Sequence, residues 1–300
     1  MGIPLRIKCA KYFEPLLASS RAPAKIDETN IYQVANQTTR AMMDELIRET
    51  ALPDSGLNKI ENFKRFYEMV TNEKKSGLIL MEHYSNFDLP GLLYFLAKDG
   101  GDWGSDFAKK IVAVAGMKLN EQNPIVRAWA EGFTRVVIYP TRSLDKATKN
   151  LADETEKANE EKRAHKINLF AMRAMHDCKK RGEVVLVFPA GTRYRPGVPE
   201  TKKGLREIDS YLRMFDILLL VSINGNCLRL NPADPDNMIM DIIENDTLTF
   251  TAHEPIVCSD FRKAAFAELP SDEPDPKQKV IDKIMSILQT QHDAVEATRK

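Results

Sequence analysis

The sequence predicts a mixed α/β protein, with a mostly parallel sheet flanked by helices and a small N-terminal helical bundle. Short apolar runs, such as residues 78–81 and 184–188, have the length and continuous apolar character of strands that are covered on both faces. Longer segments with apolar side chains three and four positions apart separate these runs, as in proteins whose strands and helices alternate. We expect a helical bundle over residues 1–75 and an α/β domain over residues 76–300.

The first 75 residues carry two helical patterns. Apolar side chains recur at helical spacing between residues 27 and 50, and Pro53 and Gly56 follow as stop signals. The pattern resumes over residues 57–74, where Phe63 and Phe66 share a face, and Gly77 ends it. Two helices and the segment before them are enough for a small bundle.

Strands and helices alternate from residue 76 onward. Strands are predicted over residues 78–81, 111–115, 136–139, 184–188 and 217–221. Helices are predicted over residues 89–98, over 149–181 as one long helix or with a single break, and over 280–289. The second of these ends in Lys179-Lys180-Arg181-Gly182, where cations in the last turn and a following glycine are typical of a helix C-terminus.

Composition limits the class of protein. Hydrophobic residues make up 43% of the chain, which is typical of a folded globular protein. No apolar run approaches the roughly 20 residues that cross a bilayer. The N-terminus lacks the features of a secretory signal, and the four cysteines are widely scattered, as in a reducing compartment. We therefore expect a soluble protein of the cytoplasm or of a plastid-stroma-like compartment, with at most peripheral contact with a membrane.

The 43 Lys and Arg balance the 43 Asp and Glu, but the charges are unevenly distributed. Residues 142–206 carry 16 basic and 9 acidic side chains, whereas residues 207–300 carry 9 and 17. Either these are solvated helix faces or the middle segment forms a site for an anion. The overall balance argues against a nucleic-acid-binding protein. No dinucleotide, P-loop or H-E-x-x-H signature is present, so no cofactor and no metal are expected.

The first motif that suggests chemistry is His83 followed by Asp88, directly after a predicted strand. Sites of α/β proteins lie at such strand ends. Asp88 could hold one imidazole nitrogen of His83, so that the other accepts a proton from a substrate hydroxyl. The structural alternative is that Asp88 caps the following helix and His83 bonds a backbone carbonyl.

Two further blocks display arginines beside predicted strands. The block Phe188-Pro189-Ala190-Gly191-Thr192-Arg193-Tyr194-Arg195 opens a loop with two guanidinium groups, which suit phosphate, and a glycine that lets backbone N–H groups approach it. The block Gly132-Phe133-Thr134-Arg135 precedes the strand at 136–139, and Arg142 follows that strand. Taken singly, each block could also be an ordinary surface turn with solvated arginines.

In this order and spacing, the three blocks resemble the glycerolipid acyltransferase superfamily, which is marked by H-x-x-x-x-D, a Gly/Phe/Arg block, an F-P-x-G-T-R block and then an apolar strand. The resemblance covers residues 76–230, and is greatest to the soluble chloroplast-type glycerol-3-phosphate acyltransferases. Those enzymes have a Lys-His pair where this chain has Arg142-Ser143.

The resemblance implies an acyltransferase that moves a fatty acyl group from acyl-ACP or acyl-CoA to glycerol 3-phosphate. His83 would be the general base and Asp88 its partner, while the acceptor would be bound by a group of loop residues: Arg142, Arg193, Arg195, Gly191, Thr192 and Arg135. A long acyl chain also predicts an apolar tunnel near the sheet. Three alternatives remain: a lysophosphatidate acyltransferase, a non-catalytic lipid- or phosphoprotein-binding relative, and an enzyme that processes phosphosugars.

Overall fold

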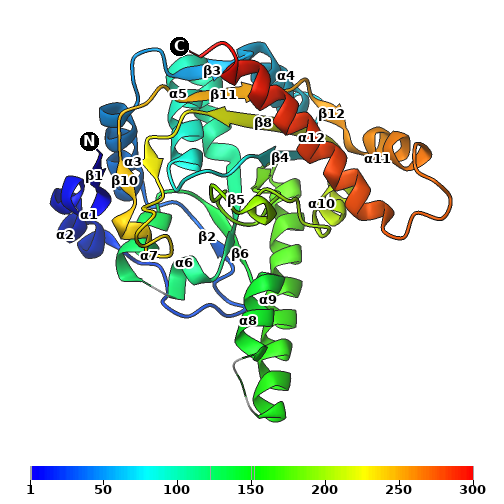
Figure 1. Cartoon of the computed structure of the whole chain (residues 1–300), viewed down its shortest axis with the longest axis horizontal. Helices are drawn as coiled ribbons and strands as arrows, with labels where there is room; N and C mark the ends of the chain where they lie inside the picture. Colours follow the sequence, from blue (N-terminus) through cyan, green and yellow to red (C-terminus); the bar gives the residue numbers. More distant parts are fainter. Residues whose placement is uncertain (1, 122, 150, 152, 300) are drawn as a thin grey trace. The chain divides into compact units, whose positions relative to one another are not determined.

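The computed structural model describes residues 2–299 except 122, 150 and 152. Contacts divide the chain into two units. The first unit comprises residues 1–8, 44–111 and 182–300, and the second comprises residues 9–43 and 112–181. Both contain parallel and antiparallel strand pairs together with helices (Figure 1), which confirms the predicted mixed α/β class.

The sheet of the first unit is centred on β4 (Gly77–Met81). This strand pairs in parallel with β7 (Val184–Val187) on one side and with β8 (Ile217–Asn224) on the other. Three further strands follow β8: β11 (Thr249–Ala252) and β12 (Ile256–Val257), both antiparallel to β8, and β3 (Gly56–Asn58), parallel to β11. Every residue of β4, β7 and β8 is buried, as the continuous apolar runs predict.

Helices cover both faces of this sheet. Helix α12 (Pro276–Glu296) crosses in front of β8 in Figure 1, whereas α4 (Ile60–Thr71) and α5 (Asp88–Lys110) lie behind the strands. The buried side of α12 is apolar and consists of Val280, Ile281, Ile284 and Leu288. The other elements of this unit are α1 (Leu5–Lys8), α10 (Ile208–Met214), α11 (Cys258–Ala267), the 3₁₀ helices η1 (Pro199–Thr201) and η2 (Met238–Met240), and an antiparallel sheet of β1 (Ile3–Pro4), β10 (Ile242–Ile243) and β9 (Leu228–Arg229).

The second unit contains a shorter run of strands. Strand β6 (Arg135–Ile138) is parallel to β5 (Ile111–Gly116) and antiparallel to β2 (Tyr32–Gln33). Its helices are α2 (Ala10–Ser19), α6 (Lys118–Glu121), α7 (Pro124–Ala130), α8 (Thr141–Lys149) and α9 (Glu154–Lys180), and α3 (Gln37–Thr50) runs across the boundary between the units. Gly182, just beyond α9, has a φ of +69°, the left-handed conformation that commonly ends helices at glycine.

The first 75 residues differ most from expectation. Helix α3 begins at Gln37 rather than near residue 27, because the Asp27 carboxylate accepts the N–H and the hydroxyl of Thr29 (2.8 and 2.6 Å) and closes a turn there. Strands β2 and β3 pair with β6 and β11, so this segment is shared between the units instead of dividing from the rest at residue 75. The helical region expected over residues 149–181 is present as α9, and α8 precedes it.

Within the part of the chain that the structure describes, no helix has both the length and the apolar composition needed to span a bilayer.

Candidate active site

The candidate site lies where the parallel strands β4 and β7 end. Because neighbouring parallel strands end at the same edge of a sheet, the segments that follow them meet there. His83 comes two residues after β4, and the loop with the two arginines comes directly after β7. The N–H of Tyr194 donates to the carbonyl oxygen of His83 (2.7 Å), which joins the two segments through their backbones.

His83 and Asp88 form a hydrogen-bonded pair. Nδ1 of His83 lies 2.9 Å from Oδ2 of Asp88, which is buried, while 16% of the His83 side chain is exposed. The carboxylate also accepts the N–H groups of Tyr84 and Ser85 (2.6 and 2.8 Å) and the Ser85 hydroxyl (2.9 Å). These donors fix the carboxylate in place. With the proton on Nδ1, Nε2 of the neutral ring is left as the basic nitrogen.

The ring of His83 is also held from the side. Phe188, the first residue after β7, stacks on it with ring centroids 3.8 Å apart and an interplanar angle of 13°. Asp88 is the first residue of α5, and its carboxylate binds the turn before the helix and the imidazole. The arrangement therefore differs from the helix cap that was the structural alternative, and it limits rotation of the imidazole.

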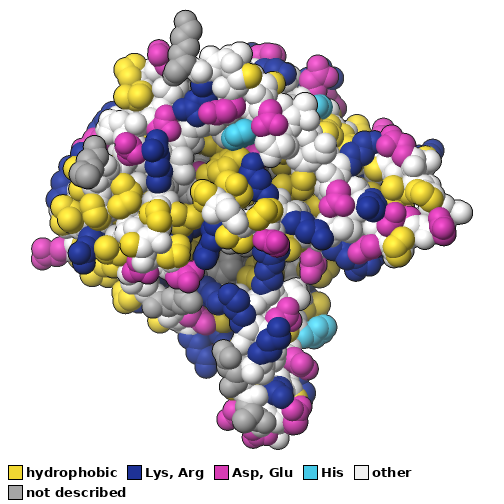
Figure 2. Space-filling view, in the orientation of Figure 1, with side chains coloured by type: hydrophobic (Ala, Val, Ile, Leu, Met, Phe, Trp, Pro, Cys, Tyr) yellow, Lys and Arg dark blue, Asp and Glu magenta, His cyan; other side chains and the backbone are white. Residues whose placement is uncertain are grey.

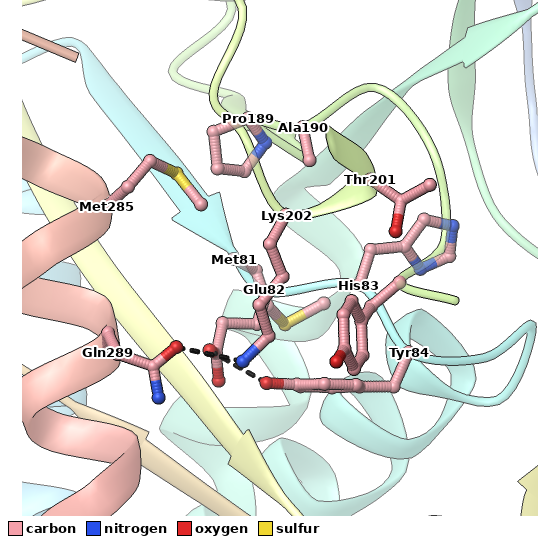
Figure 3. Close-up of a pocket in the computed structure, with 11 residues that line it drawn as sticks. Met81, Glu82, His83, Tyr84, Pro189, Ala190, Thr201, Lys202, Met285 and Gln289 are labelled. Carbon is pink, nitrogen blue, oxygen red and sulfur yellow. Dashed lines mark hydrogen bonds between the residues drawn. The ribbon is translucent and has the colours of Figure 1, made fainter. Parts of the chain in front are cut away.

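A pocket of about 90 Å³ opens beside His83 (Figure 3). It is lined by residues from β4 and the segment after it, from the loop after β7 and from α12: Met81, Glu82, His83, Tyr84, Pro189, Ala190, Tyr194, Thr201, Lys202, Met285 and Gln289. Small-molecule pockets generally exceed roughly 300 Å³. In this conformation the pocket can therefore take a small polar group but lacks the volume of the apolar tunnel expected for a long acyl chain.

A polar cluster beside the pocket, centred on the buried Glu82, attaches α12 to the end of β4. The two oxygens of Glu82 accept the Tyr84 hydroxyl (2.9 Å) and the N–H of Ile223 (2.8 Å), and Nδ1 of His292 lies 3.1 Å from Oε2. Burial alone would lower the pKa of His292, but the hydrogen bond and the charge of Glu82 outweigh it, so the pKa is raised. Burial, followed by the charge of Glu82, raises the pKa of Tyr84, which keeps its hydroxyl as a neutral donor.

Gly191 gives the loop after β7 its shape. Its φ is +64°, a conformation that side chains rarely adopt, and a Cβ at this position would lie 2.6 Å from Cδ1 of Leu205. Thr192, the next residue, is half-buried. The positive φ therefore favours a glycine here, because Leu205 could move aside but the backbone conformation would stay strained.

Both arginines of this loop are already paired with carboxylates. Nη1 of Arg193, a side chain only 11% exposed, forms an ion pair with the fully buried Asp241. Nη2 of Arg195, which is 36% exposed, lies 2.7 Å from Oδ1 of Asp236. Burial raises the pKa of Asp241, and the charge of Arg193 opposes this effect. Arg193 thus compensates a buried charge, whereas Arg195 could exchange its partner for an anionic ligand.

The other two predicted arginines belong to the second unit. Arg142 is exposed in the first turn of α8, and its contact with a phosphate stays a prediction. The expectation for Arg135 is corrected, because its side chain is fully buried and donates to the carbonyl of Ala130 and to Oε1 of Gln33. Burial lowers its pKa to about 10, while Glu131 opposes the shift. Arg135 supports the interior of this unit.

The uneven charges lie largely on solvated helices. Figure 2 shows Lys and Arg interspersed with Asp and Glu over α9, and likewise over α11 and α12. On α9, Lys157 pairs with Glu154, and Lys180 pairs with Asp177, each three residues away. Such pairs are typical of solvated helix faces, so many of the charged side chains of this segment lie on such faces.

We expect the two loop arginines to respond differently to replacement by alanine. Arg193→Ala leaves the Asp241 carboxylate buried without its cation, and should lower the free energy of unfolding by about 3 kcal/mol. Arg195→Ala, at a more exposed pair, should change that free energy by less than about 1 kcal/mol. Urea unfolding followed by circular dichroism measures both. Partial recovery of the free energy of unfolding in the double variant Arg193→Gln/Asp241→Asn would identify the ion pair as the cause. Equal stability of the two alanine variants would contradict this account.

No protein-family model and no curated protein matches this chain. Among solved structures, it is similar to the crystal structure of the 1-acyl-sn-glycerophosphate (LPA) acyltransferase PlsC from Thermotoga maritima. The two are 14% identical, the match covers 99% of this chain and 95% of the other, and the TM-score is 0.45. At this identity and TM-score, the likeness does not extend to the activity or the substrate of this chain.

Proposed function

We propose that this chain transfers a fatty acyl group from a thioester, either acyl-ACP or acyl-CoA, to a hydroxyl of glycerol 3-phosphate. The observation that carries the proposal is the His83–Asp88 pair at 2.9 Å, in which His83 lies on the wall of a small pocket that Lys202 also lines. A histidine whose Nδ1 is held by a buried carboxylate is a suitable general base for an alcohol. The order of the three sequence blocks adds the acyltransferase chemistry to this geometry.

In the proposed reaction, Nε2 of His83 accepts the proton of the acceptor hydroxyl as its oxygen attacks the thioester carbonyl carbon. Asp88 stabilises the imidazolium that forms and keeps the proton of Nδ1 in place. When the tetrahedral intermediate collapses, the carbon–sulfur bond breaks and the imidazolium returns a proton to the leaving thiolate. The products are an ester and a free thiol, and His83 is regenerated. Base catalysis of this kind contributes about 10²–10⁴ in rate.

The proposed acceptor site takes the phosphate onto the loop after β7. Arg195 can exchange its bond with Asp236 for a phosphate oxygen, because that pair is partly exposed. Gly191 and Thr192 shape the approach to the loop, and Arg193 anchors it through Asp241. Binding the phosphate would position the hydroxyl for His83.

The test is to supply the purified chain with acyl-ACP or acyl-CoA, each combined with glycerol 3-phosphate or with lysophosphatidate. We expect one free thiol and one new ester per turnover, with the highest kcat/KM for glycerol 3-phosphate. Preference for lysophosphatidate would identify the alternative acceptor. Binding of donor and acceptor without thiol release would contradict acyl transfer and favour the non-catalytic alternative.

A further inference from the structure

Lys202 places an ammonium group in the same pocket as His83. Its Nζ donates to Oε1 of Gln289 on α12 (2.8 Å) and lies 4.8 Å from the ring centroid of Tyr194 and 5.6 Å from that of Tyr84 (Figure 3). Gln289 is itself held by Asp293 through a bond of 2.6 Å. The ammonium is therefore positioned by a neutral oxygen and two aromatic faces, which leave its positive charge in place.

This group differs from the arginines of the preceding loop. Arg193 and Arg195 pair with Asp241 and Asp236, whereas none of the ion pairs among the described residues includes Lys202. Glu82 also lines the pocket, but its two oxygens already accept bonds from the Tyr84 hydroxyl and from the N–H of Ile223. An ammonium has three N–H groups, and the bond to Gln289 uses one of them. Two remain to bind an anion.

We propose that Lys202 binds the phosphate of the acceptor and thereby selects phosphorylated acceptors over uncharged ones. This inference rests on the proposed acyl transfer. It identifies Lys202 as the group in the pocket beside His83 that recognises the acceptor. A lysine ammonium is a compact charge that suits phosphate. An uncharged acceptor would leave the two remaining N–H groups of the ammonium without an anionic acceptor, and a site built for a charged group rejects a ligand that lacks it.

The experiment compares Lys202→Gln, which removes the charge but keeps a polar side chain, with Lys202→Arg, which keeps the charge. Lys203→Gln is the matched control, because the neighbouring lysine is exposed and does not line the pocket. For Lys202→Gln we expect a roughly 10- to 100-fold higher KM for glycerol 3-phosphate, since a hydrogen bond to a charged group is lost. The KM for the acyl donor and that for glycerol should stay within about threefold of wild type, and Lys202→Arg should recover most of the loss.

Inorganic phosphate gives a readout that does not depend on turnover. Titrated into the wild-type protein, it should bind with a dissociation constant that rises in Lys202→Gln and not in Lys203→Gln. An unchanged phosphate affinity in Lys202→Gln, or an equal rise of KM for glycerol and glycerol 3-phosphate, would overturn the inference. Absence of transfer in the wild-type protein would instead overturn the proposed function, and the phosphate titration would still decide the role of Lys202.

Discussion

Replacing His83 with alanine is expected to lower kcat/KM for acyl transfer about 10²–10⁴-fold, the usual contribution of a general base. The substitution removes Nε2, the nitrogen left to accept the hydroxyl proton when Asp88 holds Nδ1. The KM values should change little, because the proposed anion-binding groups are untouched. Release of thiol from the acyl donor, followed under saturating glycerol 3-phosphate, measures the effect.

The control for this variant is His165→Ala. His165 is exposed on α9 and has the same chemical type, so its replacement should leave kcat/KM within about twofold of wild type. The His83→Ala protein should keep its far-UV circular dichroism and a cooperative thermal transition, which separates loss of a base from loss of folding. Turnover near wild type in a folded His83→Ala protein would rule out His83 as the base.

The buried strands of the first unit could be predicted from sequence because their surroundings are uniform. β4, β7 and β8 are covered on both faces, so their side chains form continuous apolar runs, and only Ser222 and Asn224 at the end of β8 are polar. The rule for strand ends also explains why His83 lies next to the loop that contains Arg193. Each follows one of two adjacent parallel strands, and such strands end at one edge.

The contribution of α12 to the pocket could not be predicted in this way. The apolar spacing of its residues indicates a helix, but not which strand it crosses or which of its polar residues face a cavity. Met285 and Gln289 reach the pocket because α12 packs across β8, and that contact joins residues separated by more than 60 positions. Pocket polarity set by such long-range packing leaves no local signal in the sequence.

Arg135 shows a second limit of sequence patterns. An arginine at the edge of an apolar run usually lies in solvent, and here the run begins with Arg135 itself. The structure buries it because Gln33, on the neighbouring strand β2, and the carbonyl of Ala130 accept its N–H groups. A buried arginine needs such acceptors, and here one of them is about 100 positions away in the chain. The ion-pair partners of Arg193 and Arg195 could not be predicted from the sequence either, because their carboxylates come from a segment about 40 or more positions away.

Asp88 uses one carboxylate oxygen for two roles. Oδ2 accepts the N–H groups of Tyr84 and Ser85, which holds the turn before α5, and it also accepts the hydrogen bond from Nδ1–H of His83. Oδ1 accepts the Ser85 hydroxyl. An asparagine has the same size, and with its amide oxygen in the place of Oδ2 it can keep both the turn and the bond from Nδ1, but it lacks the negative charge.

Asp88→Asn is therefore expected to fold and to keep the proton on Nδ1, but to lower kcat/KM about 10- to 100-fold, because a neutral amide replaces the charged partner of the imidazolium that forms in the reaction. Nitrogen NMR of the imidazole checks that the tautomer is retained, and Asp106→Asn, on the same helix, serves as the control for a carboxylate lost from α5. An Asp88→Asn protein with wild-type turnover would show that the carboxylate only holds the turn and the ring and that its charge does not contribute.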